Sequence, residues 1–333
     1  MAISEHSISV GPHTTFFLQA GDESATPIIF VHGWPELSLS WRHQLPAVAQ
    51  AGFRAIAPDM RGYGRSTVYN EHGAYAQEHV VQDMLDLIDS LGIQRAIWVG
   101  HDWGSPTVWN MAAHHPERCI AVASLCVPFA TLEYGWDGFL THVDRSIYPE
   151  QELPYGQWEY MRFYEEAFDK ATHTFDSDPL AVIQLLFRKG TSEGAGLPSA
   201  TAFVRQQGGW FGGGEIPQFP RDEAVITEEE LQTYARYLKQ NTFFGPDSYY
   251  MNHTANAAFS ANARRTLDLP VLFLHARYDY TCETMTSTLA EPMRSQCTNL
   301  VEHVVDSGHW MAQEQPAAVN EHLLHWLETS VGS

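Results

Sequence analysis

The stretch that decides the fold is Trp98-Val99-Gly100-His101-Asp102-Trp103-Gly104-Ser105. It starts as an apolar run, which is typical of a buried strand, and then places glycines two residues before and two residues after Asp102. This spacing predicts a sharp turn from a strand into a helix, because a side chain at either glycine would collide with one of the two elements. The residue at the apex of such a turn is well placed to act as a nucleophile, and here it is an aspartate.

The segments around this turn alternate between strand and helix patterns. The expected elements are a hairpin over residues 6–20, strands near 27–31, 53–57, 96–99 and 120–127, and helices near 38–50, 76–91 and 104–114. Most of these strands are short, continuous apolar runs, as in strands that are buried on both faces. The alternation predicts a mostly parallel α/β sheet between two layers of helices, with a ligand cleft at the carboxyl ends of its strands.

From about residue 131 to residue 262 this alternation is lost. Aromatic residues and helix formers dominate there, and residues 208–214 are too rich in glycine for regular structure. Strands near 269–275 and 300–305 and a helix near 316–329 then resume the pattern. We therefore expect a core domain of residues 1–130 and 263–333, with a helical cap of residues 131–262 inserted after the sixth strand. The glycine-rich loop of this cap is a candidate gate for the cleft.

Composition narrows the choice of partner. The chain has 333 residues with 40 acidic and 19 basic side chains, a formal charge of −21, which argues against nucleic acid or an anionic membrane and favours a small neutral or cationic ligand. The four cysteines are widely spaced and predict neither a zinc site nor a disulfide framework. The first residues lack the pattern of a signal peptide, and no run approaches the ~18 apolar residues of a membrane span. We expect a cytoplasmic protein.

Two residues that follow later strands are candidate partners of Asp102. Asp279 lies a few residues past the strand near 269–275, and His309, after Gly308, lies just past the strand near 300–305. Nucleophile, acid and histidine in this chain order form one of the known kinds of catalytic triad. The loop after the strand near 120–127 offers only Glu133 as a nearby carboxylate, which favours Asp279 as the acid.

An aspartate in the place of the nucleophile changes the expected chemistry. An aspartate side chain of ordinary pKa, about 3.9, is ionised near neutral pH and needs no base to activate it. Asp102 would attack an alkyl carbon and form an ester, and His309 would then activate water against that ester. The backbone N–H groups of Trp103 and Trp34 are the candidate donors to the oxyanion that forms on the ester carbonyl.

The leaving atom must also be stabilised. Tyrosine hydroxyls can hydrogen-bond an epoxide oxygen and protonate the alkoxide that forms, whereas a halide requires weakly polar N–H donors. The expected cap offers Tyr160 and Tyr250 for the first role. Aromatic residues suggest an apolar pocket, for which the candidate lining residues are Trp34, Trp103, Phe129 and Trp210.

Together these stretches resemble the soluble type of epoxide hydrolase, which has the α/β-hydrolase fold and is related to haloalkane dehalogenases. The matching stretches are His32-Gly33-Trp34-Pro35, residues 59–64, residues 100–104, Phe244-Gly245-Pro246 with Tyr249-Tyr250-x-Asn252, Asp279, and Gly308-His309-Trp310. The resemblance implies an eight-stranded sheet with a cap, and conversion of an apolar or aromatic epoxide and water to a vicinal diol, without a metal or cofactor. It also implies that Asp102, His309 and Asp279 act as nucleophile, base and orienting acid, and that Tyr250 and Tyr160 hold the epoxide oxygen.

Several alternatives remain open at this point. Tyr155 and Tyr164 compete with Tyr160 as the first cap tyrosine. A haloalkane dehalogenase would use the same Asp102 and His309, with the Trp103 N–H as one halide donor. A ligand receptor without catalytic activity is a third possibility, and both a monomer and a homodimer are compatible with the sequence.

Overall fold

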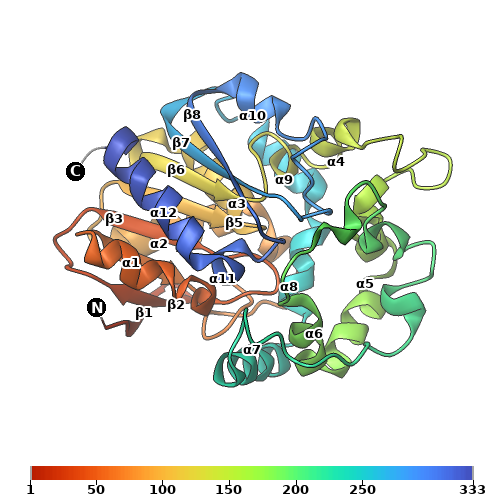
Figure 1. Ribbon diagram of the computed structural model, residues 1–333. Coiled ribbons are helices and arrows are strands. Elements are labelled where there is room, and N and C mark those ends of the chain that lie inside the picture. Colours follow the sequence, from red (N-terminus) through yellow and green to blue (C-terminus); the bar gives the residue numbers. More distant parts are fainter. Residues whose placement is uncertain (1, 332–333) are drawn as a thin grey trace.

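The computed structural model describes residues 2–331. A sheet of eight strands lies at its centre, with helices on both faces (Figure 1). Its strands are β1 (Ser4–Val10), β2 (His13–Ala20), β3 (Pro27–Val31), β4 (Arg54–Pro58), β5 (Ala96–His101), β6 (Cys119–Leu125), β7 (Leu267–Ala276) and β8 (Cys297–Val305). Their order is β1-β2-β4-β3-β5-β6-β7-β8; the β1–β2 and β2–β4 pairs are antiparallel and the other pairs are parallel. The expected fold class is confirmed.

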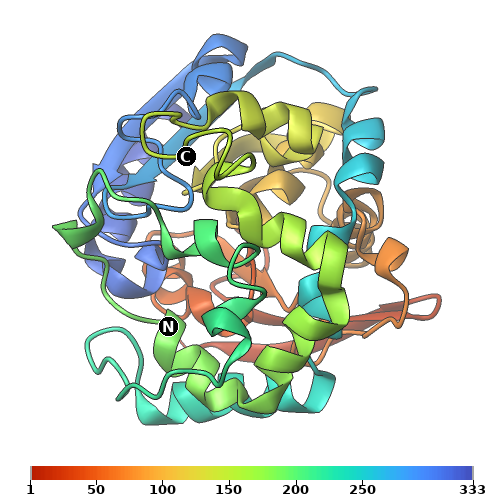
Figure 2. The ribbon, with the colours of Figure 1, turned by 90° about the vertical axis from the view of Figure 1, so that its right-hand side faces the viewer.

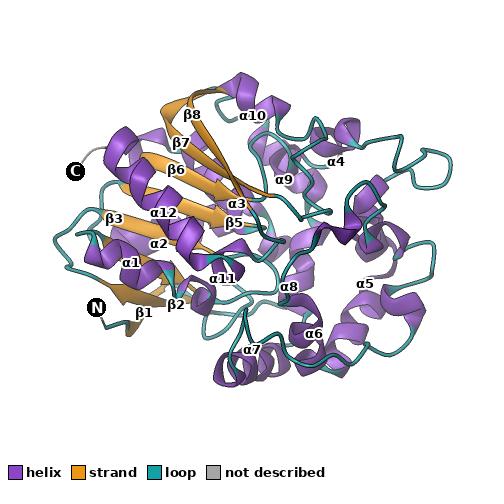
Figure 3. Ribbon diagram, in the orientation of Figure 1, coloured by secondary structure: helices purple, strands orange, loops and turns teal. Residues whose placement is uncertain are grey.

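The helices form two layers against the sheet and a separate group beside it (Figure 3). They are α1 (Gln44–Gln50), α2 (Gln77–Ser90), α3 (Gly104–His114), α4 (Trp136–Phe139), α5 (Glu159–Ser177), α6 (Pro179–Leu186), α7 (Glu228–Asn241), α8 (Phe244–Ser248), α9 (His253–Ser260), α10 (Glu291–Gln296), α11 (Met311–Glu314) and α12 (Pro316–Trp326). On one face α1 packs against α12, and on the other α2 packs against α3. No helix between residues 2 and 331 combines the length and the apolar composition that crossing a lipid bilayer requires.

Several boundaries differ from the expected ones. The helix expected over residues 38–50 is a 3-10 turn (Ser38–Trp41) followed by α1, since Pro46 has no N–H to bond the preceding turn of a continuous helix. The strand expected over 120–127 ends at Leu125 because Cys126 takes a positive φ of 69°. The last helix, α12, ends at Trp326 and continues as a wider turn over Leu327–Val331.

The segment between β6 and β7 lies at the edge of the sheet where the parallel strands end. In Figure 2 this segment, from yellow-green to cyan, faces the viewer in front of the sheet. Within it α6 packs against α7 and α5 packs against α8, while α9 packs instead on α2 and α3. Since parallel strands share one direction, the residues that follow β3, β5, β6, β7 and β8 all meet beneath this segment.

Candidate active site

The turn at Asp102 is as sharp as its glycines predict. β5 ends at His101 and α3 begins at Gly104, and Asp102 itself has a φ of 50°, which is costly for any residue except glycine. A Cβ on Gly100 would lie 2.5 Å from the carbonyl oxygen of Gly104, and one on Gly104 would collide with the carbonyl of Val31. The strand, the helix and the neighbouring strand β3 therefore hold the Asp102 carboxylate at the carboxyl end of the sheet.

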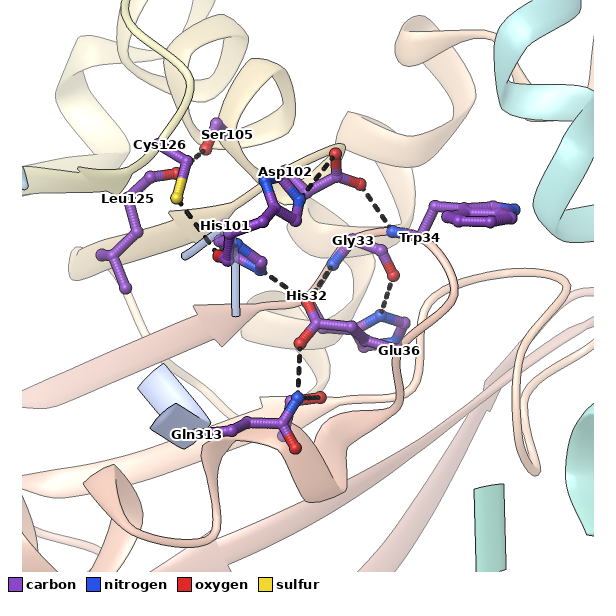
Figure 4. Close-up of polar contacts among 12 residues, drawn as sticks. His32, Gly33, Trp34, Glu36, His101, Asp102, Ser105, Leu125, Cys126 and Gln313 are labelled. Atoms are coloured by element: carbon purple, nitrogen blue, oxygen red, sulfur yellow. Dashed lines mark hydrogen bonds and ion pairs between the residues drawn. The ribbon is translucent and has the colours of Figure 1, made fainter. Parts of the chain in front are cut away.

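A backbone amide from the loop after β3 bonds one oxygen of this carboxylate. The N–H of Trp34 donates to Asp102 Oδ1 at 2.6 Å, as Figure 4 shows. Trp103 directly precedes α3, and a Cβ added to Gly33 would meet both the Asp102 carboxylate and the Trp103 amide nitrogen. The absence of a side chain at Gly33 thus lets the loop after β3 approach closely enough for both amides to lie beside Asp102.

His309 lies between two carboxylates. Its Nδ1 is 2.6 Å from Asp279 Oδ2, and its Nε2 is 3.5 Å from Asp102 Oδ2. The other oxygen of Asp279 accepts the backbone N–H groups of Thr281 and Cys282. Burial alone would lower the pKa of His309, but the charge of Asp279 and hydrogen bonds to Asp102 and Asp279 raise it well above its usual value. Burial would likewise raise the pKa of Asp279, but His309 outweighs it and the pKa is lowered.

Tyr160 and Tyr250 face each other over Asp102. Their ring centroids are 5.5 Å apart with a tilt of 73°, and both side chains border the same cavity as Asp102. Burial raises the pKa of each hydroxyl well above its usual value, and the nearby charge of Asp102 raises both further, so both hydroxyls keep their protons. Each of them is therefore available as a hydrogen-bond donor.

The two competing tyrosines lie elsewhere. Tyr164 stacks on Tyr250, with centroids 4.8 Å apart and a tilt of 3°, and its hydroxyl is 3.3 Å from Asp247 Oδ1. Tyr155 packs against Trp136 and lines neither of the cavities that Asp102 borders. Of the candidates in α5 and the residues before it, the geometry therefore favours Tyr160.

Two cavities meet at Asp102, Tyr160 and Cys282. The narrow cavity, of about 20 Å³, is otherwise lined by Trp103, Val127, Pro128, Thr131, Leu132, Phe139, Trp158, Met161 and Leu289. The wide cavity, of about 190 Å³, is otherwise lined by Trp34, Leu186, Thr201, Trp210, Tyr250, Asp279, Thr281, His309 and Trp310. The expected lining residues Trp34, Trp103 and Trp210 are thus among those placed here, whereas Phe129 packs against Trp109 in the core.

Comparison with known proteins places this geometry in a family. The family model described as alpha/beta hydrolase fold matches residues 26–316. Epoxide hydrolase A of Mycobacterium tuberculosis is 32% identical over 312 residues, which cover 93% of this chain and 92% of that protein. The chain belongs to the epoxide hydrolase family of the α/β-hydrolase fold.

Other members agree with this assignment. Bifunctional epoxide hydrolase 2 of Rattus norvegicus is 34% identical over 95% of this chain, and the chain spans about half of that relative, 53% of its length. The crystal structure of epoxide hydrolase A from Mycobacterium thermoresistibile is 28% identical, covers 98% of this chain and 99% of its own, and superposes with a TM-score of 0.81. An epoxide hydrolase from an endophytic Streptomyces, 27% identical, covers 98% of this chain and 95% of its own with a TM-score of 0.80.

Beneath the site of this epoxide hydrolase family member lies a buried ion pair that sequence reasoning did not predict. His101 Nδ1 is 2.7 Å from Glu36 Oε2, and His101 Nε2 donates to the backbone carbonyl of His309 at 2.7 Å. Glu36 also accepts the N–H of Gly33 and a side-chain N–H of Gln313 (Figure 4). The pair thus connects the loop after β3, the turn at Asp102 and the loop that carries His309.

A second buried carboxyl group was also not predicted. Asp247 in α8 accepts the indole N–H of Trp34 at 2.8 Å and the hydroxyl of Thr172 at 2.9 Å. Burial raises the pKa of Asp247 to about 8, although these hydrogen bonds oppose the shift. The sequence signal for this contact was weak, because Trp34 and Asp247 are 213 residues apart and a lone aspartate after Gly-Pro reads as a turn residue.

Proposed function

We propose that this member of the epoxide hydrolase family converts an apolar or aromatic epoxide and water to a vicinal diol through an alkyl ester on Asp102. The observation that supports this most directly is the surroundings of Asp102. One oxygen accepts the Trp34 N–H, the other faces His309, and the hydroxyl-bearing rings of Tyr160 and Tyr250 border the same cavity.

In the first step Asp102 Oδ2 attacks an epoxide carbon, and the carbon–oxygen bond of the ring breaks. Oδ1 stays beside the N–H of Trp34, where it becomes the carbonyl oxygen of the ester. The epoxide oxygen gains negative charge and takes a proton from Tyr160 or Tyr250, because burial raises the pKa of both hydroxyls well above its usual value and both still carry their protons at this stage.

In the second step water attacks the ester carbonyl, and His309 accepts its proton. The charge of Asp102 disappears when the ester forms, so one of the two carboxylates that raise the pKa of His309 is lost. The pKa of His309 therefore falls at the stage when a base is needed. The N–H groups of Trp34 and Trp103 stabilise the oxyanion. Its collapse breaks the bond between the Asp102 carboxyl carbon and the substrate oxygen, which takes the proton of the new carboxyl group and leaves as a hydroxyl of the diol. The proton on His309 then returns to the tyrosine that lost one in the first step.

The surroundings favour an epoxide over a haloalkane. A halide needs a second N–H donor besides that of Trp103; the indole N–H of Trp34 is already donated to Asp247, which leaves the indoles of Trp158 and Trp210 as candidates. The two tyrosines have no role in halide release. We further propose that residues 131–262 act as a cap domain, that one epoxide substituent enters the apolar narrow cavity, and that the larger one lies in the wide cavity.

A single turnover in ¹⁸O-labelled water tests the ester mechanism. Water attacks the carbonyl carbon of the ester, so the label should appear in the Asp102 carboxylate and not in the first diol. Peptide mass spectrometry locates the label. Label in the first-turnover diol would mean that water attacks the epoxide directly, and the ester scheme would then be wrong.

A parallel assay separates the alternative functions. The full chain is incubated with an aryl epoxide such as styrene oxide and with a 1-haloalkane of similar size, and diol and halide release are measured. We expect diol formation at a much higher kcat/KM than halide release. The reverse preference would establish a dehalogenase, and tight binding of the epoxide without turnover would establish a receptor.

A further inference from the structure

We propose that Asp279, Cys282 and His309 form a binding site for a thiophilic divalent metal ion, such as Zn²⁺ or Cd²⁺, and that occupation of this site inhibits the enzyme. The binding part concerns only these three side chains. The inhibitory part rests on the function proposed above for His309.

The fold brings three different ligand types together. One ligand atom each from Asp279, Cys282 and His309 lie within 4.8 Å of one another. Asp279 and Cys282 belong to one tight turn after β7, in which the Cys282 N–H donates to Asp279 Oδ1 at 2.9 Å. His309 comes from the loop after β8 and is held by its 2.6 Å contact with Asp279. A thiolate, an imidazole and a carboxylate in this arrangement are the common ligands of zinc, with bond lengths of about 2.0–2.3 Å.

The cluster is also accessible. Cys282 borders both cavities, and Asp279 and His309 border the wide cavity. A metal ion that enters the wide cavity can therefore reach all three side chains and keep a water molecule as its fourth ligand. Binding displaces the thiol proton of Cys282 and any proton on the coordinating nitrogen of His309 to solvent, and no oxidation or reduction takes place.

A neighbouring cluster provides a built-in comparison. His101, Cys126 and His309 also place ligand atoms within 4.8 Å of one another. However, the ring nitrogens of His101 are bonded to Glu36 and to the His309 carbonyl, and Cys126 Sγ donates to that same carbonyl at 3.3 Å. Both Cys126 and His101 are 1% exposed. The ligand atoms of His101 and Cys126 are thus occupied by hydrogen bonds and buried away from solvent, so this second cluster should not bind the metal ion.

The expected inhibition has a specific form. A metal ion bound to Asp279 and His309 replaces the hydrogen bond between these two side chains. It also coordinates the imidazole ring that would otherwise accept a proton from water. The attack of Asp102 on the epoxide does not use that ring. Metal-loaded enzyme should therefore consume about one equivalent of epoxide and then retain it as the ester.

The test compares metal binding and inhibition in the full chain and in two matched variants. Isothermal titration calorimetry with Zn²⁺ and the ultraviolet thiolate-to-metal absorption of Cd²⁺ measure binding, and diol formation with and without metal measures inhibition within each variant. We expect one ion per wild-type chain. Cys282→Ser should weaken binding at least tenfold and abolish the thiolate absorption and most of the inhibition, whereas Cys126→Ser should behave as the wild type does.

The outcomes separate the two parts of the proposal. Equal binding by wild type and Cys282→Ser, or loss of binding only in Cys126→Ser, would overturn the site. Cys282→Ala, with thermal unfolding of each variant, guards against a loss of binding that reflects misfolding. The calorimetric and absorption readouts still test the site if the chain turns over no epoxide. Metal binding without loss of diol formation would overturn the inhibitory part alone.

Discussion

Glu36 Oε2 lies 2.7 Å from His101 Nδ1, and both side chains are buried beneath the turn that carries Asp102. Burial alone would raise the pKa of Glu36 and lower that of His101. Their mutual attraction reverses both shifts, so that the pKa of Glu36 falls to about 2 and that of His101 rises to about 10. The pair therefore remains charged across the pH range in which most enzymes work, and it links the loops of Trp34 and His309 to the turn at Asp102.

Replacing one partner of this pair should destabilise the protein strongly. Glu36→Gln leaves a buried histidine without its counter-charge, so we expect the free energy of unfolding to fall by about 3–5 kcal/mol near neutral pH. Glu5→Gln is a matched control, because Glu5 pairs with Arg65 at the surface and should matter by less than about 1 kcal/mol. Chemical denaturation measures both changes.

The difference in the free energy of unfolding between wild type and Glu36→Gln should depend on pH, and this dependence tests whether the pair is ionised. The stabilisation by Glu36 is present above its unfolded pKa of 4.5 and is lost as pH falls through about 2. The stabilisation by His101 is complete below its unfolded pKa of 6.5 and is lost as pH rises through about 10. The difference between wild type and Glu36→Gln should thus be largest between these two unfolded values. A difference that does not vary with pH would mean that the pair is not ionised.

Asp247 should also make the stability depend on pH, but because its pKa is raised on folding, whereas that of Glu36 is lowered. Its pKa rises from 3.8 to about 8 on folding, so the folded protein keeps a proton that the unfolded chain releases between these values. Stability should therefore fall as pH rises through this window. Asp247→Asn keeps an acceptor for Trp34 and removes the titration, so its stability relative to wild type should increase by at least about 1 kcal/mol from pH 5 to pH 9. Parallel pH profiles in thermal unfolding would contradict this.

The roles proposed for Asp102 and His309 can be tested separately. His309→Gln should still form the ester but hydrolyse it slowly, so diol release should fall by about 10²–10⁴-fold. Mass spectrometry of the protein mixed with substrate should then show the added mass of the epoxide on the peptide that contains Asp102. Asp102→Ala combined with His309→Gln is the control and should show no adduct. Loss of diol release without an adduct in His309→Gln would refute the assigned order of steps.

The tyrosine pair predicts a graded loss of ring opening. Tyr250→Phe and Tyr160→Phe should each slow ester formation by about a hundredfold, and the double variant should nearly abolish it. Tyr164→Phe is the control, because that hydroxyl lies against Asp247 and not over Asp102, and it should change the rate only a few-fold. Rapid mixing with tryptophan fluorescence follows ester formation. Wild-type rates in both single variants and in the double variant would remove the tyrosines from the mechanism.

Sequence reasoning located the residues that lie at strand ends. Asp102, Asp279 and His309 each follow an apolar run, and parallel strands bring such positions to one edge, so their meeting could be predicted without coordinates. The sequence named Tyr160 but left Tyr155 and Tyr164 as competitors, because residues 160 and 164 lie one helical turn apart and differ mainly in what their hydroxyls face.

The remaining features depend on contacts that no local pattern records. Glu36 and His101 are 65 residues apart, and each reads alone as an ordinary polar residue next to a turn. Cys282 seemed unremarkable because its partner His309 comes from a different loop. Phe129 lies in the segment that follows β6, but it packs against Trp109 while its neighbours Val127 and Pro128 border the narrow cavity.

Trp34 donates two hydrogen bonds: its backbone N–H donates to Asp102, and its indole N–H donates to Asp247. The first contact is to the proposed nucleophile. The second is to a residue of α8 that lies two residues before the short turn that carries Tyr250. An exchange of residues 131–262 with the equivalent part of another family member would therefore replace the acceptor of the indole. A functional chimaera of this enzyme would need an incoming segment that supplies its own acceptor at that point, or a different residue at position 34.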